Sequence, residues 1–573
     1  MALSALEIEN RQTLSRRDAP RGRVPVAALG MFLITLILAL PVLVVFGYMF
    51  VPSGEIWDHL ASTVLPLYLV NTLLLALGVS VLVLLIGVGT AWLVTMCDFP
   101  GRRIFSWALF LPLAMPAYII AYTYTGMFDY AGPVQTALRE AFGWGRMDYW
   151  FPSVRSIGGA ILMFGLVLYP YVYLVSRAAF VEQSIAALEV GRTLGRGPWR
   201  GFFSIALPLA RPAIVTGLAL ALMETLSDFG AVQYFAIDTF TTGIYRTWFG
   251  LGEPAAAAQL AAILMLFVFS LIIIERLNRG GRKFHHTGRY LAISRYRLSP
   301  GRRLLAFLAC LLPIFFGFLL PTGWLLKDSI LHSSSAFNAG FAGLVFSSVS
   351  VSLVASVLAL LVALLLIYGS RRASRAPSCL EQVSLRIAAM GYAVPGPVLA
   401  VGIMLPFGFI DNGIDHWMRS TFGISTGLLL SGTMVALFFA YTVRFLAISL
   451  NTVEAGADTV TPNMDRAART LGVTGFAKLR RVHLPIISGS LMTALLLVFV
   501  DVMKELPATL VMRPFGFETL AVRAYELAID ERLADAAAPS LAIVLAGILP
   551  VIILSRAISR SRPGQKADAG KAI

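Results

Sequence analysis

Charged residues are scarce in this sequence: only 13% of its 573 residues are Asp, Glu, Lys or Arg, whereas 58% are hydrophobic. So small a charged fraction excludes an ordinary water-soluble domain and indicates a membrane protein. Cysteine is also rare. Cys97, Cys310 and Cys379 are far apart and lie in or beside apolar segments, so they predict neither a disulfide framework nor a zinc cluster.

Acidic residues are fewer than basic ones, 31 against 46. A basic excess can indicate nucleic-acid binding, but here Lys and Arg fall in short loops between apolar runs, so no nucleic-acid partner is expected. The sequence also lacks a Gly-x-x-x-x-Gly-Lys-Ser/Thr phosphate loop. We therefore expect no enzymatic ATP hydrolysis and no bound cofactor in this chain.

Long apolar runs are what the sequence does contain. A helix needs roughly twenty apolar residues to cross a bilayer, and about twelve such runs are present. They predict an all-α, polytopic membrane protein of about twelve transmembrane helices. The predicted spans are Val26–Val51, Tyr68–Val94, Ile104–Phe128, Ile157–Val175, Pro208–Thr225, Ala255–Ile274, Leu304–Leu326, Val345–Tyr368, Ile387–Ile410, Leu428–Val443, Pro485–Val502 and Pro539–Leu554.

The positions of Lys and Arg predict the orientation of these spans. Five arginines precede the first span, and nine Lys or Arg residues without an acid occupy the stretch from Arg276 to Arg303. Loops on the opposite side are mixed or acidic, as at Asp411 and Asp415. Because basic loops stay in the cytoplasm, we expect both termini to be cytoplasmic.

The chain contains an internal repeat. Gly195 and Gly472 are 277 residues apart, and so are Pro208 and Pro485, each within a similar polar loop. Six spans per half give both copies the same orientation, so the repeat is parallel. The predicted organisation is a cytoplasmic segment 1–25, a first half 26–275, a basic linker 276–303, a second half 304–555 and a cytoplasmic tail 556–573.

Each repeated loop predicts an elbow on the cytoplasmic face. A short amphipathic helix, Ser184–Leu194 or Pro462–Leu471, breaks at a glycine, and a second helical stretch leads to a Leu-Pro that starts the next span. The alternative is a basic helix that only meets anionic lipid. The candidate coupling residues are Glu189, Gly195, Ile205, Leu207 and Pro208 in the first copy, and Arg466, Ala467, Ala468, Gly472, Leu484 and Pro485 in the second.

These loops resemble the coupling loop of membrane subunits of ABC importers: Glu-Ala-Ala, three residues, Gly, nine residues, then Ile-x-Leu-Pro. The first copy has Val190 and Gly191 in place of the two alanines. The second copy has Arg466 in place of the acid, with Asp465 adjacent. The resemblance implies the type I ABC importer permease fold, two cytoplasmic ATPase subunits that use ATP, and a periplasmic substrate-binding protein. The departures predict that the two loops couple unequally.

The fused twelve-span plan, with the segments Asp501–Ala521 and Tyr392–Ala400, resembles ferric-iron permeases of bacterial inner membranes, which implies the same location for this chain. Thiamine, polyamine and phosphonate permeases share much of this pattern. The resemblance implies import of ferric iron, or of another small solute, by alternating access. The rival hypotheses are a proton-coupled secondary transporter and a membrane scaffold.

Ionisable residues inside the predicted spans are candidates for a translocation pathway or gate. Glu224 and Asp228 lie four residues apart near the end of the fifth span, and the repeat pairs them with Asp501 and Glu505, beside Lys504. Hard cations favour such oxygen ligands. The alternative is structural: the carboxylates pair with Lys504, Arg246, Arg523 or helix ends. Which residues hold a metal, if any, stays open.

Two prolines and three tyrosines complete the candidates. Pro116 and Pro395 fall inside the third and ninth spans, where proline kinks a helix, either as a gate hinge or for packing. Tyr118, Tyr122 and Tyr124 are expected either to line the pathway or to form an aromatic belt at the membrane interface, and we favour the belt.

Overall fold

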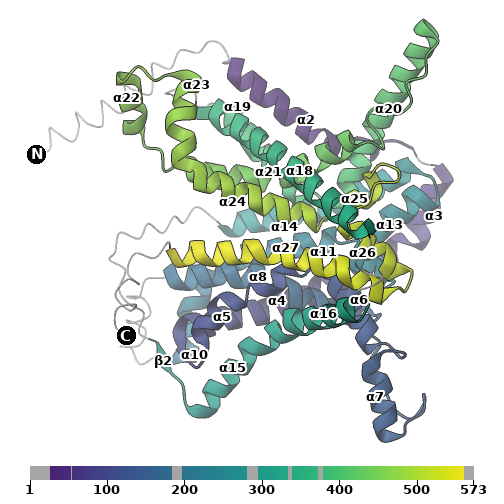
Figure 1. The fold of residues 1–573 in the computed structure, drawn as a ribbon, viewed down its shortest axis with the longest axis vertical. Helices are drawn as coiled ribbons and strands as arrows, with labels where there is room; N and C mark the ends of the chain where they lie inside the picture. Colours follow the sequence, from purple (N-terminus) through teal and green to yellow (C-terminus); the bar gives the residue numbers. More distant parts are fainter. Residues whose placement is uncertain are drawn as a thin grey trace, which may run out of the picture.

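The computed structural model describes residues 26–52, 54–182, 197–279, 295–332, 339–371 and 379–560. Within these ranges the chain is almost entirely helical, and the only sheet pairs β1 (Cys97–Asp98) with β2 (Tyr296–Arg297). The long helices lie side by side in one bundle (Figure 1). The segments 1–25 and 561–573, most of the linker, and the predicted helix Ser184–Leu194 lie outside the described residues.

Eleven helices in the described ranges are long and apolar enough to cross a membrane, or twelve when one bent pair counts as a span. The first half contains α2 (Val26–Tyr48), α4 (Leu65–Met96), α5 (Arg102–Ala108), η1 (Leu111–Ala114), α6 (Ala117–Phe128), α8 (Ile157–Glu182), α10 (Pro198–Gly201), η2 (Phe202–Ala206), α11 (Leu207–Ser227) and α14 (Pro254–Arg279). The second contains α15 (Pro300–Ile314), η4 (Phe315–Leu319), α16 (Leu320–Leu331), α18 (Ala339–Arg371), α19 (Cys379–Ala388), η5 (Gly391–Ala393), α20 (Gly396–Phe422), α21 (Met434–Ala457), α23 (Gly475–Lys478), η6 (Leu479–His483), α24 (Leu484–Met503) and α27 (Leu533–Arg560).

The shorter helices lie at the ends of the spans. They are α3 (Gly54–Thr63), α7 (Pro133–Phe142), α12 (Gly230–Tyr234), α13 (Phe240–Tyr245) with the π turn η3 (Arg246–Gly250), α22 (Pro462–Thr470), α25 (Pro507–Met512) and α26 (Leu520–Ile529). In Figure 1, α22, α23 and α10 lie at one end of the bundle, and α7 and α3 at the other.

Helix α4 shows why these sequences form membrane spans. Val79 and Val83 are buried against neighbouring helices, whereas Leu77 and Leu85 on the same helix are exposed. A helix that is apolar on every face satisfies all its backbone hydrogen bonds internally and can present leucine to lipid. The fold class predicted from the apolar runs is confirmed.

The third and ninth spans are broken rather than gently kinked. The segments Arg102–Ala114 and Ala117–Phe142 meet at an angle of 89°. Pro116 and Pro395 each lie between a 3₁₀ turn and the helix that follows. Both prolines have an extended backbone, with φ near −60° and ψ of 143° for Pro116 and 142° for Pro395. Proline cannot donate the hydrogen bond that would carry the preceding helix through, so each span restarts there.

The tenth span differs from its predicted bounds. The prediction Leu428–Val443 ends before a charged residue, but α21 begins at Met434 and continues through Arg444 to Ala457. Gly427 and Gly432, both with positive φ, form the turn that delays its start. Arg444 does not end the helix because its side chain is buried inside the protein.

The helix boundaries follow the internal repeat. Ile157, Pro198, Phe202 and Leu207 begin α8, α10, η2 and α11, and the residues 277 positions later begin α21, α23, η6 and α24. The two halves also exchange helices. The first span, α2, packs on α19 and α20 of the second half, whereas α27 packs on η1 and α6 of the first.

Candidate functional site

A central cavity of about 100 Å³ lies between the two halves. Helices α6, α8 and α11 of the first half line it, together with residues from η5 to α25 of the second. Its wall contains every ionisable residue predicted for the pathway. The charged side chains that line it are Glu224, Asp228, Arg444, Asp501, Lys504 and Glu505.

Two of these carboxylates hold the start of a short helix. Asp228 follows α11, and its Oδ1 accepts hydrogen bonds from the backbone N–H groups of Ala231 (2.8 Å) and Val232 (3.4 Å) in α12. Glu505, its counterpart in the repeat, accepts from the N–H groups of Ala508 and Thr509, both at 3.0 Å, at the start of α25. Carboxylates at helix N-termini satisfy free donors and oppose the positive end of the helix dipole.

The other two carboxylates have side-chain partners. Tyr392 donates its hydroxyl hydrogen bond to Oε1 of Glu224 across the two halves at 2.6 Å. Asp501 pairs with Lys504, whose Nζ lies 2.8 Å from Oδ1. Of the partners named by the structural alternative, Lys504 and helix ends are therefore present. Arg246 instead pairs with Asp238 at 2.5 Å, and Arg523 lies 3.9 Å from Glu518.

Arg444 is the cavity residue that sequence reasoning missed. Only 8% exposed, it places Nη1 3.6 Å from Oε1 of Glu505, and within the described residues this nitrogen makes no hydrogen bond. Gly396 makes room for it, since a Cβ there would lie 2.6 Å from Nη1. A lone arginine between apolar stretches was the available signal, because a charge at membrane depth is costly and faces the interior.

The two halves contribute unequal charge to the cavity. The first half supplies Glu224 and Asp228 and no base. The positions that correspond to Arg444 and Lys504 in the first half are Val167 and Ser227, which line the same cavity. Both cations therefore come from the second half, beside that half's own carboxylates.

The structure places the predicted prolines and tyrosines in the interior of the bundle. Pro116 lines the cavity, whereas Pro395 does not; it precedes Gly396, which lies against the cavity residue Arg444. The predicted aromatic belt is wrong: Tyr118, Tyr122 and Tyr124 are at most 5% exposed. The break at Pro116 turns this short helix into the interior, where Tyr118 lines the cavity.

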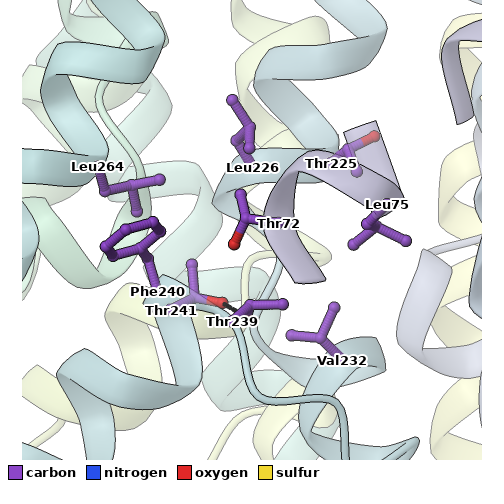
Figure 2. Close-up of a pocket in the computed structure, with 9 residues that line it drawn as sticks. All are labelled: Thr72, Leu75, Thr225, Leu226, Val232, Thr239, Phe240, Thr241 and Leu264. Atoms are coloured by element: carbon purple, nitrogen blue, oxygen red, sulfur yellow. Dashed lines mark hydrogen bonds between the residues drawn. The ribbon is translucent and has the colours of Figure 1, made fainter. Parts of the chain in front are cut away.

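A second, smaller cavity of about 10 Å³ is lined by four threonines and apolar side chains (Figure 2). Thr241 donates a hydrogen bond to the carbonyl oxygen of Asp228 at 2.7 Å, so this region helps to fix the loop after α11. Oγ1 of Thr72 has no partner in the described part of the chain. The space is about that of one water molecule, which would satisfy this hydroxyl.

The second coupling loop has the predicted elbow geometry. Helix α22 ends at Thr470, and Gly472 has a φ of +75°, the left-handed conformation that ends a helix. Helix α23 and the π turn η6 then run directly into α24, which begins at Leu484 and Pro485. Arg466 and Ala467 are exposed and Ala468 is buried, so α22 presents one face outward.

An ionic cluster fixes this elbow to its span. Oδ1 of Asp465 in α22 lies 2.8 Å from Nε2 of His483 and 3.0 Å from Nζ of Lys478. His483 is 5% exposed and stacks on Tyr368 of α18, with ring centroids 5.3 Å apart. Burial would raise the pKa of Asp465, but the hydrogen bonds and charges of Lys478 and His483 outweigh it and lower that pKa below its ordinary value.

The first coupling loop is described only in part. Glu189 and Gly195 lie outside the described residues. Ile205 lies in the π turn η2, and Leu207 and Pro208 begin α11, which matches the second copy. The residues that correspond to Asp465, Lys478 and His483 are Leu188, Gly201 and Ala206, so the sequence of the first loop does not repeat this ionic cluster at the same positions.

The sequence of this chain is similar to those of known proteins. Residues 83–280 match the family described as "Binding-protein-dependent transport system inner membrane component". The chain is 26% identical to the Fe(3+)-transport system permease protein FbpB 2 of Haemophilus influenzae, over 85% of this chain and 89% of that protein. It is 32% identical to the molybdenum transport system permease protein ModB of Escherichia coli, over 37% of this chain and 95% of that protein.

The chain belongs to the inner-membrane permease family of binding-protein-dependent ABC importers. It is a fused, two-half permease: a span of 224 residues covers nearly all of ModB, whereas the similarity to FbpB 2 extends over 495 residues. It is a multi-pass transporter subunit and not an enzyme, and the family works with an ATPase and a substrate-binding protein. The secondary-transporter and scaffold hypotheses are set aside.

Proposed function

We propose that the cargo of this permease is a cation, and ferric iron in particular. The observation that carries the proposal is the charge of the central cavity. Four acidic side chains against two basic ones leave an excess of two negative charges when all are ionised. Such a wall attracts a cation and repels molybdate or sulfate, and the repulsion is strong where water is scarce.

The contacts with the cargo are brief. Within the described ranges no three His, Cys, Asp or Glu side chains come together as a metal-binding group. A pathway that held a trivalent ion with many oxygen ligands would not release it. Glu224 is the main contact in this proposal, because its described partner is the neutral Tyr392 and not a cation.

The two coupling loops each receive one copy of a cytoplasmic ATPase, which uses the ATP. Leu471 (80% exposed), Phe476 and Met464 give the second loop an exposed apolar surface for this contact. ATP-driven closure of the ATPase pair moves both elbows, and the central cavity between the halves alternates between inward and outward opening. In this orientation both termini and the linker 276–303 are cytoplasmic, and a periplasmic binding protein delivers cargo at the opposite end.

The test is uptake into proteoliposomes that contain the permease, its ATPase and the binding protein. We expect ATP-dependent uptake of ferric iron, and no uptake of molybdate or sulfate. Glu224→Gln should reduce iron uptake several-fold, whereas Glu253→Gln, a control outside the cavity wall, should not. ATP-driven uptake of an oxyanion would refute the cation proposal. Uptake of thiamine or a polyamine would support the proposal that the cargo is a cation but would contradict its assignment as iron.

A further inference from the structure

Two segments extend sideways from the bundle and have no role in the cavity or the coupling loops. The first comprises residues 129–156 and contains α7; the second comprises residues 411–433, the last turns of α20 and the loop that returns to α21. Figure 1 shows α7 and the end of α20 extending from opposite sides of the bundle. We call these segments the lateral arms.

The arms occupy equivalent places in the two halves. Each follows one of the broken spans, α6 or α20, and each helix ends at a left-handed glycine, Gly143 (φ 65°) or Gly423 (φ 66°). Both lie at the bundle end opposite α22 and α23 (Figure 1). A feature present in both halves points to a shared use.

The first arm has a defined internal structure. Arg139 donates to the hydroxyl of Tyr149 at 3.0 Å and to the carbonyl oxygen of Tyr130 at 2.9 Å. Tyr149 donates to Gln135, which in turn donates to the carbonyl oxygen of Phe128 at the end of α6. These bonds fix α7 and its return loop to the span, so the arm is ordered without a partner.

The second arm is ordered by its acidic residues. Asp411 accepts hydrogen bonds from the backbone of Leu430 and Ser431 in the return loop. Asp415 accepts from Thr426 N–H at 2.8 Å and pairs with Arg419 at 2.7 Å. The acids predicted for this outer loop therefore hold the arm together rather than face solvent freely.

Both arms expose large apolar and aromatic side chains. In the first, Met147 is 91% and Trp150 is 85% exposed, and Phe142 stacks on Trp144. In the second, and in the turn of α20 just before it, the exposed side chains are Phe409, Trp417, Phe422, Ile424 and Leu428. Exposure of such apolar surfaces to water is unfavourable in free energy, so they are expected to contact a partner or a membrane.

We propose that the lateral arms bind the interface of the phospholipid bilayer and insert these side chains between the headgroups. The arms continue directly from spans of the bundle, and Trp and Tyr prefer the membrane–water boundary. The first arm has three acidic and three basic residues, so zwitterionic lipid suffices. Sideways extension also keeps the arms away from the cavity. Assignment to the outer leaflet rests on the orientation proposed above, but the lipid contact does not.

The test uses the full chain in phosphatidylcholine nanodiscs. Cys379→Ser leaves only the buried Cys97 and Cys310, after which Met147→Cys or Ile424→Cys carries a bimane fluorophore. The matched control is Phe515→Cys, at a fully exposed position in the loop between α25 and α26. Monodisperse elution checks that each variant folds, without reference to transport.

Lipid carrying a nitroxide near its headgroup should quench the probes at 147 and 424 several-fold more than the probe at 515, and aqueous iodide should show the reverse order. The same result in phosphatidylglycerol would confirm that lipid charge is unimportant. Iodide quenching equal to that at position 515 would overturn the proposal. So would protection from iodide that appears only when the binding protein is added, or only when two permeases share a nanodisc.

Discussion

Single residues in the cavity show how a membrane interior tolerates charge. Asp228 and Glu505 accept hydrogen bonds from backbone N–H groups of the helices that follow them. Asp501 and Arg444 each lie beside a side chain of opposite charge. Glu224 differs because its described partner is a tyrosine hydroxyl. The Glu224 carboxylate therefore contributes less to holding the structure together than the other three carboxylates do.

Replacement of Arg444 tests the balance of this charge network. Arg444→Met should lower the stability of the folded permease by about 1–3 kcal/mol, because Glu505 would keep its backbone donors but lose its nearby cation. Thermal unfolding in detergent measures the change, with Arg444→Lys as the control that keeps the charge. Equal melting temperatures for Arg444→Met and the unaltered protein would contradict this view of the pair.

Asp465 gives a dependence on pH. Its pKa is lowered in the folded protein from an ordinary value of 3.8, so its carboxylate stabilises the fold at neutral pH, and this contribution is lost as the pH falls through the lowered value. The melting temperature of Asp465→Asn should therefore lie below that of the unaltered protein at neutral pH. The gap should narrow below about pH 4. A gap independent of pH would show that ionisation of Asp465 does not stabilise the elbow.

At the scale of elements, the coupling elbow is a continuous mechanical connection. The π turn η6 joins α23 to α24 without a loop, and the Asp465 cluster ties α22 to the same turn. In the proposed mechanism, a displacement of α22 by the ATPase therefore reaches α24, which carries Asp501 and leads into Lys504 and Glu505. The corresponding residues of the first loop, Leu188, Gly201 and Ala206, cannot form these ion pairs.

A substitution at Gly472 tests this connection. Gly472→Val should leave membrane insertion unchanged but reduce cargo transported per ATP, because a β-branched residue is strained at a φ of +75° by at least about 1–2 kcal/mol. The control is Gly489→Val in α24, where no neighbouring atom lies within 4 Å of the position that a Cβ would occupy. Equal coupling ratios in both variants would remove the elbow from the mechanism.

Much of this architecture follows from the sequence, for identifiable reasons. Apolar runs and the fixed offset of 277 residues predict the spans, the repeat and the elbow because each depends on local pattern. The carboxylates are recognisable because charge is rare at membrane depth. Their partners are not: the backbone donors for Asp228 and Glu505 arise from helix breaks, the contact of Tyr392 with Glu224 joins the two halves, and that of Arg444 with Glu505 joins two consecutive spans. The aromatic belt fails as a prediction because the turn at Pro116 redirects α6.

At the scale of the whole molecule, the two halves are not independent units. Helix α2 packs on α19 and α20, and α27 packs on η1 and α6, so each half covers faces of the other. The two hydrophobic cores likewise combine residues from both ends of the chain. A rocking motion must therefore occur between groups of helices that include members of both halves.

Cutting the chain in the linker tests this exchange of helices. Residues 1–286 and 287–573 expressed together should co-purify as a folded complex, since the packing does not require a covalent link. Either fragment expressed alone should aggregate or be degraded, because its exchanged helices lack their partners. Size-exclusion chromatography measures both outcomes. A monodisperse single half would refute the interdependence.

The exchanged helices also determine the order in which the protein can be completed during synthesis. When the ribosome has finished the first half, α2 is already in the membrane, but α19 and α20 do not yet exist. The helix that covers η1 and α6 arrives even later, because α27 is the last span to be made. Until then, the faces of α2 and α6 that pack on the second half lack those partners, although both helices also pack within the first half.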